Sequence, residues 1–210
     1  MTNPAATERE LLCNLFPEVG PQAPTLCGDW TTLDLAAHLV VRDRRPDSLP
    51  GLVFDFAAGH TEKLRLEATQ QPFEELVDQV RSGPPRWSPA SFALVDKATN
   101  TIEFFVHHED VRRGSGSGAE RDLPAATEDE LWSGLKRVAP VLRRQSPAPL
   151  TIATDDGREL KIKSGPSPVR VTGPVGELVL FMYGRQAVAH VDVAGDQNAI
   201  DQVMTAAFGV

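Results

Sequence analysis

The feature that most constrains the fold is a change in hydrophobic periodicity near Pro147. Before it, apolar residues recur at intervals of three and four, which is typical of amphipathic helices. After it, apolar and polar residues alternate over 150–152 and 160–162, as they do in half-buried strands. We therefore predict an α+β protein with an N-terminal helical domain at residues 1–146 and a small α+β domain at 147–210.

Turn formers and capping residues give the element limits. Thr31 or Thr32 can cap a helix that runs to about Arg45, with Asp34 placed for a capping box. The other expected helices are 7–16, ended by Pro17, and 60–70, 73–81, 88–97, 102–113 and 128–144. In the second domain we expect a hairpin turning at Asp155-Asp156-Gly157, strands at 169–172 and 188–193, and helices at 176–183 and from Asp196 to Phe208.

Composition excludes several classes of protein. The net charge of -8, with a pI near 5.1, argues against a nucleic-acid-binding surface. No stretch reaches the roughly 20 apolar residues that span a bilayer, and the N-terminus lacks the pattern of a signal peptide, so we expect a cytoplasmic protein without a membrane partner. Two cysteines cannot form a disulfide framework, and we interpret Cys13 and Cys27 as small buried apolar residues.

His38 is the first candidate for chemistry. It shares a helix face with Leu35 and Leu39, so it should be buried. A buried imidazole needs a partner for each nitrogen or a metal on one of them. The pattern at His38 alone is also that of a core histidine hydrogen-bonded to a carbonyl or a side chain.

The second candidate is the segment from Glu103 to Asp110. Glu103 and His107 are four residues apart, so they project from one helix face and can share an ion. Asp110 could orient the imidazole of His107. Such a pair also arises by chance, but here it lies in an apolar helix and a second buried histidine is available. Three protein ligands and one open position are typical of catalytic zinc, although nickel, manganese and iron accept similar ligands.

The remaining histidines have weaker patterns. His108 lies about 100° around the helix from His107, so we expect it to be an outer partner of the metal ligands or to be exposed. His60 is interpreted as a residue at the start of a helix. His190 falls on the polar side of its expected strand and should be exposed or lie at a domain interface.

Three segments resemble a known family. Trp30-Thr-Thr-Leu-Asp-Leu-Ala-Ala-His38 resembles a segment of the superfamily that includes DinB and mycothiol-dependent maleylpyruvate isomerase. Glu103-x3-His107-x2-Asp110 resembles the motif of that isomerase. The tail from Gly173 through Arg185 to Asp196 is similar to its small C-terminal domain.

The resemblance implies a DinB-like four-helix bundle that binds a divalent ion, expected to be zinc, through His38, Glu103 and His107. It implies that the metal activates the thiol of mycothiol, a cosubstrate. The activated thiol would then react with a small electrophilic substrate, in an isomerisation or an S-transfer. Asp110 and Arg185 would then be catalytic residues, and Arg185 would face an anionic substrate. An arginine after an apolar helix is equally often a C-terminal capping cation.

Two further functions compete with a thiol-dependent metalloenzyme. The chain could be a non-enzymatic protein that binds a small ligand and holds a structural metal. It could also contain no metal and a hydrogen-bonded pair of His38 and Glu103. An open coordination position would favour the enzyme over the structural metal, and metal analysis would separate both from the third option.

Overall fold

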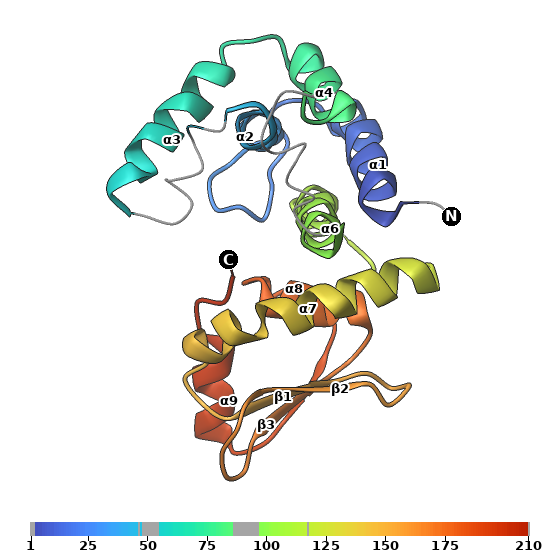
Figure 1. The fold of residues 1–210 in the computed structure, drawn as a ribbon, viewed down its shortest axis with the longest axis vertical. Coiled ribbons are helices and arrows are strands. Elements are labelled where there is room, and N and C mark those ends of the chain that lie inside the picture. The colour runs from blue at the N-terminus through green and yellow to red at the C-terminus, as the bar shows by residue number, and fades with distance from the viewer. Residues whose placement is uncertain (1–2, 46, 48–54, 86–96, 117, 210) are drawn as a thin grey trace. The chain divides into compact units, whose positions relative to one another are not determined.

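The computed structural model describes residues 3–45, 47, 55–85, 97–116 and 118–209. Within these residues the chain is an α+β protein that combines helices with a small mixed sheet, which confirms the predicted fold class (Figure 1). It forms two compact units, Met1–Gly118 and Ala119–Val210. No helix in this part of the chain is both long and apolar enough to cross a membrane. The helix expected at 88–97 falls almost entirely outside the described residues.

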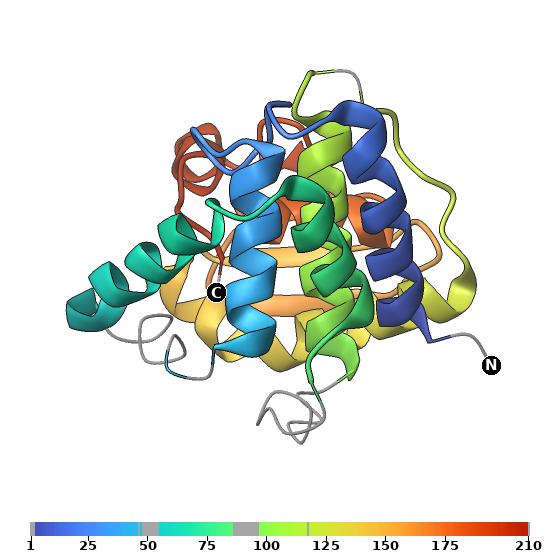
Figure 2. The ribbon, with the colours of Figure 1, turned by 90° about the horizontal axis from the view of Figure 1, so that it is seen from above.

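The first unit is helical. Its elements are α1 (Pro4–Val19), α2 (Thr32–Arg44), α3 (Asp55–Ala68), α4 (Phe73–Ser82) and α6 (Lys97–Arg113). Helix α1 packs along α6 and α4, and α2 packs against α3 and α4 (Figure 2). Their apolar faces enclose one core, which includes Leu12, Phe16, Leu39, Leu76 and Phe104. That core supports the two helices, α2 and α6, that carry the candidate ligands.

Helix α1 continues past Pro17, where we expected it to end. It ends at Val19, and the φ of 80° at the following C-cap residue, Gly20, suits glycine. A proline within a helix leaves the carbonyl four residues earlier without its usual donor. Here Arg81 Nη2 donates to that carbonyl of Cys13 at 3.1 Å, so a tertiary contact replaces the lost hydrogen bond.

The start of α2 agrees with the predicted cap. The Thr31 hydroxyl accepts from the Asp34 backbone, and the Asp34 carboxylate accepts from the Thr31 backbone N–H at 2.9 Å. Arg65 of α3 forms an ion pair with the same carboxylate. The entry of α2 is therefore fixed six residues before His38.

The second unit holds a four-stranded sheet in the order β2-β1-β3-β4. The strands are β1 (Leu150–Ala153), β2 (Glu159–Lys163), β3 (Val169–Thr172) and β4 (Asp192–Ala194), with β1 antiparallel to β2 and parallel to β3. Its helices are α7 (Ala125–Gln145), α8 (Val175–Met182) and α9 (Gln197–Met204). Every residue of α8 is buried, which makes this helix the centre of the unit.

Several limits differ from those expected. Helix α3 begins at Asp55, so His60 does not lie at a helix start, and α6 begins at Lys97 instead of residue 102. Strand β4 is shorter and later than 188–193, and α9 ends at Met204 before Phe208. Helix α7 packs on α8 and β2, so it goes with the second unit although its periodicity resembles that of the helices before it. The predicted domains at 1–146 and 147–210 describe parts of the chain that would fold independently, and that stays a prediction.

Candidate metal site

Helix α6 presents Glu103 and His107 on one face. Because they lie four residues apart, His107 Nε2 is 3.4 Å from Glu103 Oε1. The other ring nitrogen, Nδ1, lies 3.0 Å from Oδ2 of Asp110. The two nitrogens of His107 thus face two different carboxylates.

Helix α2 brings His38 to the same place. Its Nε2 is 3.8 Å from Glu103 Oε1, and its ring centroid is 5.5 Å from that of His107. The side chains of His38, Glu103 and His107 are 19%, 25% and 13% exposed. The structure therefore brings together the three residues proposed from sequence, and it leaves each partly accessible.

An arginine completes the surroundings of Glu103. Arg42 Nε lies 3.3 Å from Glu103 Oε1, and its Nη2 donates to Asn100 Oδ1 at 2.9 Å. Arg42 follows His38 by four residues, so the same helical spacing that links Glu103 to His107 could have identified it.

The charges around the cluster shift all three pKa values. Burial opposes ionisation of Glu103, but the Arg42 charge and hydrogen bonds from both histidines outweigh it and hold the pKa well below the ordinary value. Burial also opposes protonation of His107, yet hydrogen bonds to Asp110, Cys27 and Glu103 raise its pKa well above the ordinary value. Burial lowers the pKa of His38. In the metal-free protein these shifts favour protonation of His107 and the neutral form of His38.

The donor set fits a divalent ion. Donors around a tetrahedral zinc ion lie about 3.3 Å apart, since each is about 2.0–2.1 Å from the metal. The separations of 3.4 and 3.8 Å from Glu103 Oε1 to the two imidazoles exceed this value by about 0.1 and 0.5 Å. Asp110 engages Nδ1 of His107, which leaves Nε2 as the nitrogen directed at Glu103.

Comparison with solved structures adds information about the fold. In fold, the chain is similar to a mycothiol-dependent maleylpyruvate isomerase. The crystal structure of that enzyme matches with a TM-score of 0.61 and 12% identity, and that of a histidine-to-alanine mutant with 0.61 and 13%. Each match covers 90% of this chain and 88% of the other. The resemblance inferred from the sequence is thereby confirmed at the level of fold. No known family and no curated protein matches the chain by sequence.

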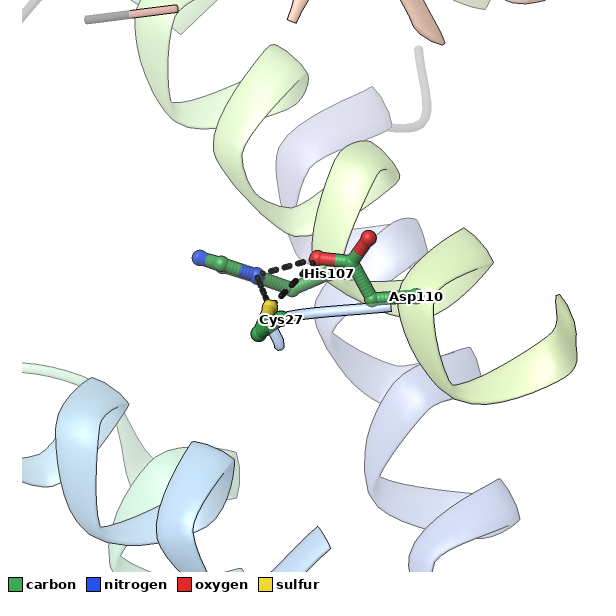
Figure 3. Close-up of side chains that lie close together, drawn as sticks. All are labelled: Cys27, His107 and Asp110. Atoms are coloured by element: carbon green, nitrogen blue, oxygen red, sulfur yellow. Dashed lines mark hydrogen bonds and ion pairs between the residues drawn. The ribbon is translucent and has the colours of Figure 1, made fainter. Parts of the chain in front are cut away.

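Cys27, like Arg42, is a residue of the site that the sequence interpretation missed. It is only partly buried and makes polar contacts, so its interpretation as a buried apolar residue is wrong. Its Sγ lies 3.0 Å from Asp110 Oδ2 and 3.9 Å from His107 Nδ1. Figure 3 shows how the three side chains converge. Cys27 belongs to the loop before α2, 80 residues from His107. No periodicity connects a loop cysteine with a distant helix, so the sequence held no signal for this contact.

The other histidines lie apart from the cluster. His108 is buried, and its Nδ1 lies 2.9 Å from Oε2 of the buried Glu8 on α1. The expectation that it was exposed or an outer partner of the ligands is wrong, because the face of α6 that carries His108 packs on α1. His60 is exposed within α3 and pairs with Asp47 at 3.0 Å. His190 is exposed, as expected.

Arg185 lies in the second unit, just after α8. Its guanidinium donates to the carbonyl of Tyr183, the C-cap residue of that helix. Its backbone N–H bonds to Leu180 at 2.9 Å, beyond Gly184 with a φ of 84°. These are features of a Schellman C-cap, and they favour the capping role over the substrate-binding role.

Proposed function

We propose that this protein is a metal-dependent enzyme that uses mycothiol, of the isomerase or S-transferase type, and that its first unit is a DinB-like four-helix bundle. The observation that supports it best is the convergence of two imidazoles and one carboxylate, with Asp110 bonded to the far nitrogen of His107. The fold likeness to a mycothiol-dependent isomerase is consistent with it. A low-molecular-weight thiol as cosubstrate would place the protein in a reducing cytoplasm.

Each residue has a distinct task in this proposal. His38, Glu103 and His107 would hold one divalent ion, with zinc the best match to two nitrogens and one oxygen. Such an ion lowers the pKa of a bound thiol, which yields a nucleophilic thiolate near neutral pH. Asp110 accepts a hydrogen bond from Nδ1–H of His107 and so fixes the ring. Arg42 adds positive charge beside Glu103, which favours an anionic ligand at the remaining position.

The competing state is a cluster that needs no metal. Arg42 and the two histidines already surround Glu103, so its charge is compensated within the protein.

A non-enzymatic protein with a structural metal is the other alternative. Partial exposure of the three side chains favours an open site over a closed structural one.

Metal content tests the ligand set. The purified protein is loaded with zinc, dialysed and analysed by mass spectrometry for metal per chain. We expect one ion in the wild type and in His60→Ala, and loss of that ion in His38→Ala and His107→Ala. His60 is a matched control because it is an exposed histidine of the same unit, paired with a carboxylate. Equal metal content in all four proteins would overturn the site.

Thiol binding tests the activity class. The protein is loaded with cobalt(II), and mycothiol is added while the visible spectrum is recorded. We expect a sulfur-to-cobalt charge-transfer band with mycothiol and none with its S-methyl derivative, which cannot form a thiolate. Stoichiometric cobalt binding without that band would favour the structural-metal alternative.

A further inference from the structure

One oxygen atom is shared by two side chains beside the proposed ligands. Asp110 is completely buried, and its Oδ2 lies 3.0 Å from His107 Nδ1 and 3.0 Å from Cys27 Sγ (Figure 3). The thiol and the imidazole therefore converge on the same carboxylate oxygen from two different segments. A buried carboxylate held on one oxygen by two donors has little freedom to rotate.

The loop that carries Cys27 is anchored to the same residue. The backbone N–H of Leu26 donates to the Asp110 carbonyl at 3.1 Å. Within the loop, Thr25 Oγ1 accepts from the Cys27 backbone at 3.1 Å and donates to the Trp30 carbonyl at 2.7 Å. The backbone at Cys27 is thus held in place by contacts that do not involve the thiol.

Cys27, His107 and Asp110 also have the chemistry of a cation site. Sulfur and oxygen ligands of a tetrahedral zinc ion lie about 3.6 Å apart, given their usual distances from the metal. The observed 3.0 Å between Cys27 Sγ and Asp110 Oδ2 is shorter, and it suits a thiol that donates to a carboxylate. The geometry therefore favours a hydrogen-bonded triad.

We propose that Cys27 is a positioning residue for His107. Its thiol donates to Asp110 Oδ2 and orients the carboxylate, which in turn holds the imidazole with Nδ1–H toward Asp110 and Nε2 toward Glu103. This inference deepens the proposed function and rests on it. The thiol would neither bind the metal nor react with substrate.

Zinc affinity of Cys27 variants tests the inference. Cys27→Ala and Cys27→Val remove the donor, and we expect zinc dissociation constants about 10- to 100-fold higher than wild type, the usual effect of removing an outer partner of a ligand. Cys27→Ser keeps a donor and should return to within about threefold of wild type. The matched control is Cys13→Ala, because Cys13 is a fully buried thiol of the same unit bonded to the Val77 carbonyl. It should lower stability without changing zinc affinity.

A double mutant tests whether Cys27 acts through Asp110. In an Asp110→Ala background, Cys27→Ala should have no further effect on zinc affinity, since the shared acceptor is gone. Wild-type affinity in Cys27→Ala and Cys27→Val, or equal losses in both backgrounds, would overturn the inference while the metal site stands.

A second readout does not need metal. Long-range proton–nitrogen NMR of the metal-free protein reports the Nδ1–H of His107. We expect a slowly exchanging signal in wild type and Cys27→Ser, and faster exchange in Cys27→Ala. Should the wild type bind no metal at all, the proposed function fails, and this measurement still decides the role of Cys27. An unchanged signal in Cys27→Ala would refute that role.

Discussion

Replacing Glu103 by glutamine keeps the shape of the side chain and removes its charge. The Oε1 atom lies 3.3 Å from Arg42 Nε and 3.4 Å from His107 Nε2. With an effective dielectric constant of about 20, each contact represents roughly 5 kcal/mol of gross Coulomb attraction. Desolvation of the ions and the 25% exposure of Glu103 offset most of this. We expect a net loss of about 1–3 kcal/mol in the free energy of unfolding of the metal-free protein.

Thermal unfolding tests the expected loss of stability, and zinc binding tests the role of Glu103 as a ligand. For a chain of 210 residues, a loss of about 2 kcal/mol lowers Tm by roughly 4–8 °C. The same substitution removes the only anionic ligand proposed for the ion, so zinc affinity should fall by more than ~100-fold, beyond the effect of losing an outer partner. Calorimetry of the metal-free protein and a zinc competition titration measure the two quantities.

A matched control uses another glutamate of the same unit. Glu67 is 57% exposed and pairs with Lys63 at 3.8 Å on the surface of α3. Glu67→Gln should change stability by less than about 0.5 kcal/mol and leave zinc binding unaltered. Zinc affinity in Glu103→Gln equal to that of Glu67→Gln would refute the assignment of Glu103 as a ligand.

Three other predictions concern residues on α6 and their partners. Glu8→Ala leaves the buried His108 without its carboxylate partner, and it should lower the free energy of unfolding, measured by chemical denaturation, by about 3 kcal/mol. Glu10→Ala, at a 53% exposed position on the same helix, should lower it by less than about 0.5 kcal/mol. Equal losses in the two variants would contradict the pairing of Glu8 with His108. Zinc must displace a proton from His107, whose pKa is raised, so affinity should fall about tenfold per pH unit as pH decreases below that pKa. Conversely, the stability that His107 gives the metal-free protein is complete below pH 6.5 and is lost as pH rises through the raised pKa. A zinc affinity that stays flat between pH 6 and 8 would refute the exchange of proton for metal.

The parts of the site that sequence could predict depend on short-range spacing. Glu103, His107 and Asp110 lie within eight residues of one helix, and helical geometry alone places them on neighbouring positions. The capping box at Thr31 is equally local. These local relations do not depend on tertiary contacts, so they could be predicted without knowing the fold.

The missed parts depend on packing between distant segments. Cys27 reaches Asp110 because its loop lies on α6, and Glu8 reaches His108 across 100 residues because α1 packs on that helix. Arg81 compensates for the proline in α1 from the end of α4. None of these contacts has a periodicity, and each is set by which helix faces meet.

The charges around His107 bear on what the open position would accept. In the metal-free protein, the positive charges of Arg42 and protonated His107 balance the negative charges of Glu103 and Asp110. Exchange of one proton on His107 for a divalent ion leaves this group with one excess positive charge. In a partly buried site such an excess is stabilised by an anion more than by a neutral ligand. A monoanion restores neutrality whereas a neutral ligand does not, so under the proposed function the arrangement of Arg42 beside Glu103 suits a thiol that binds as its thiolate.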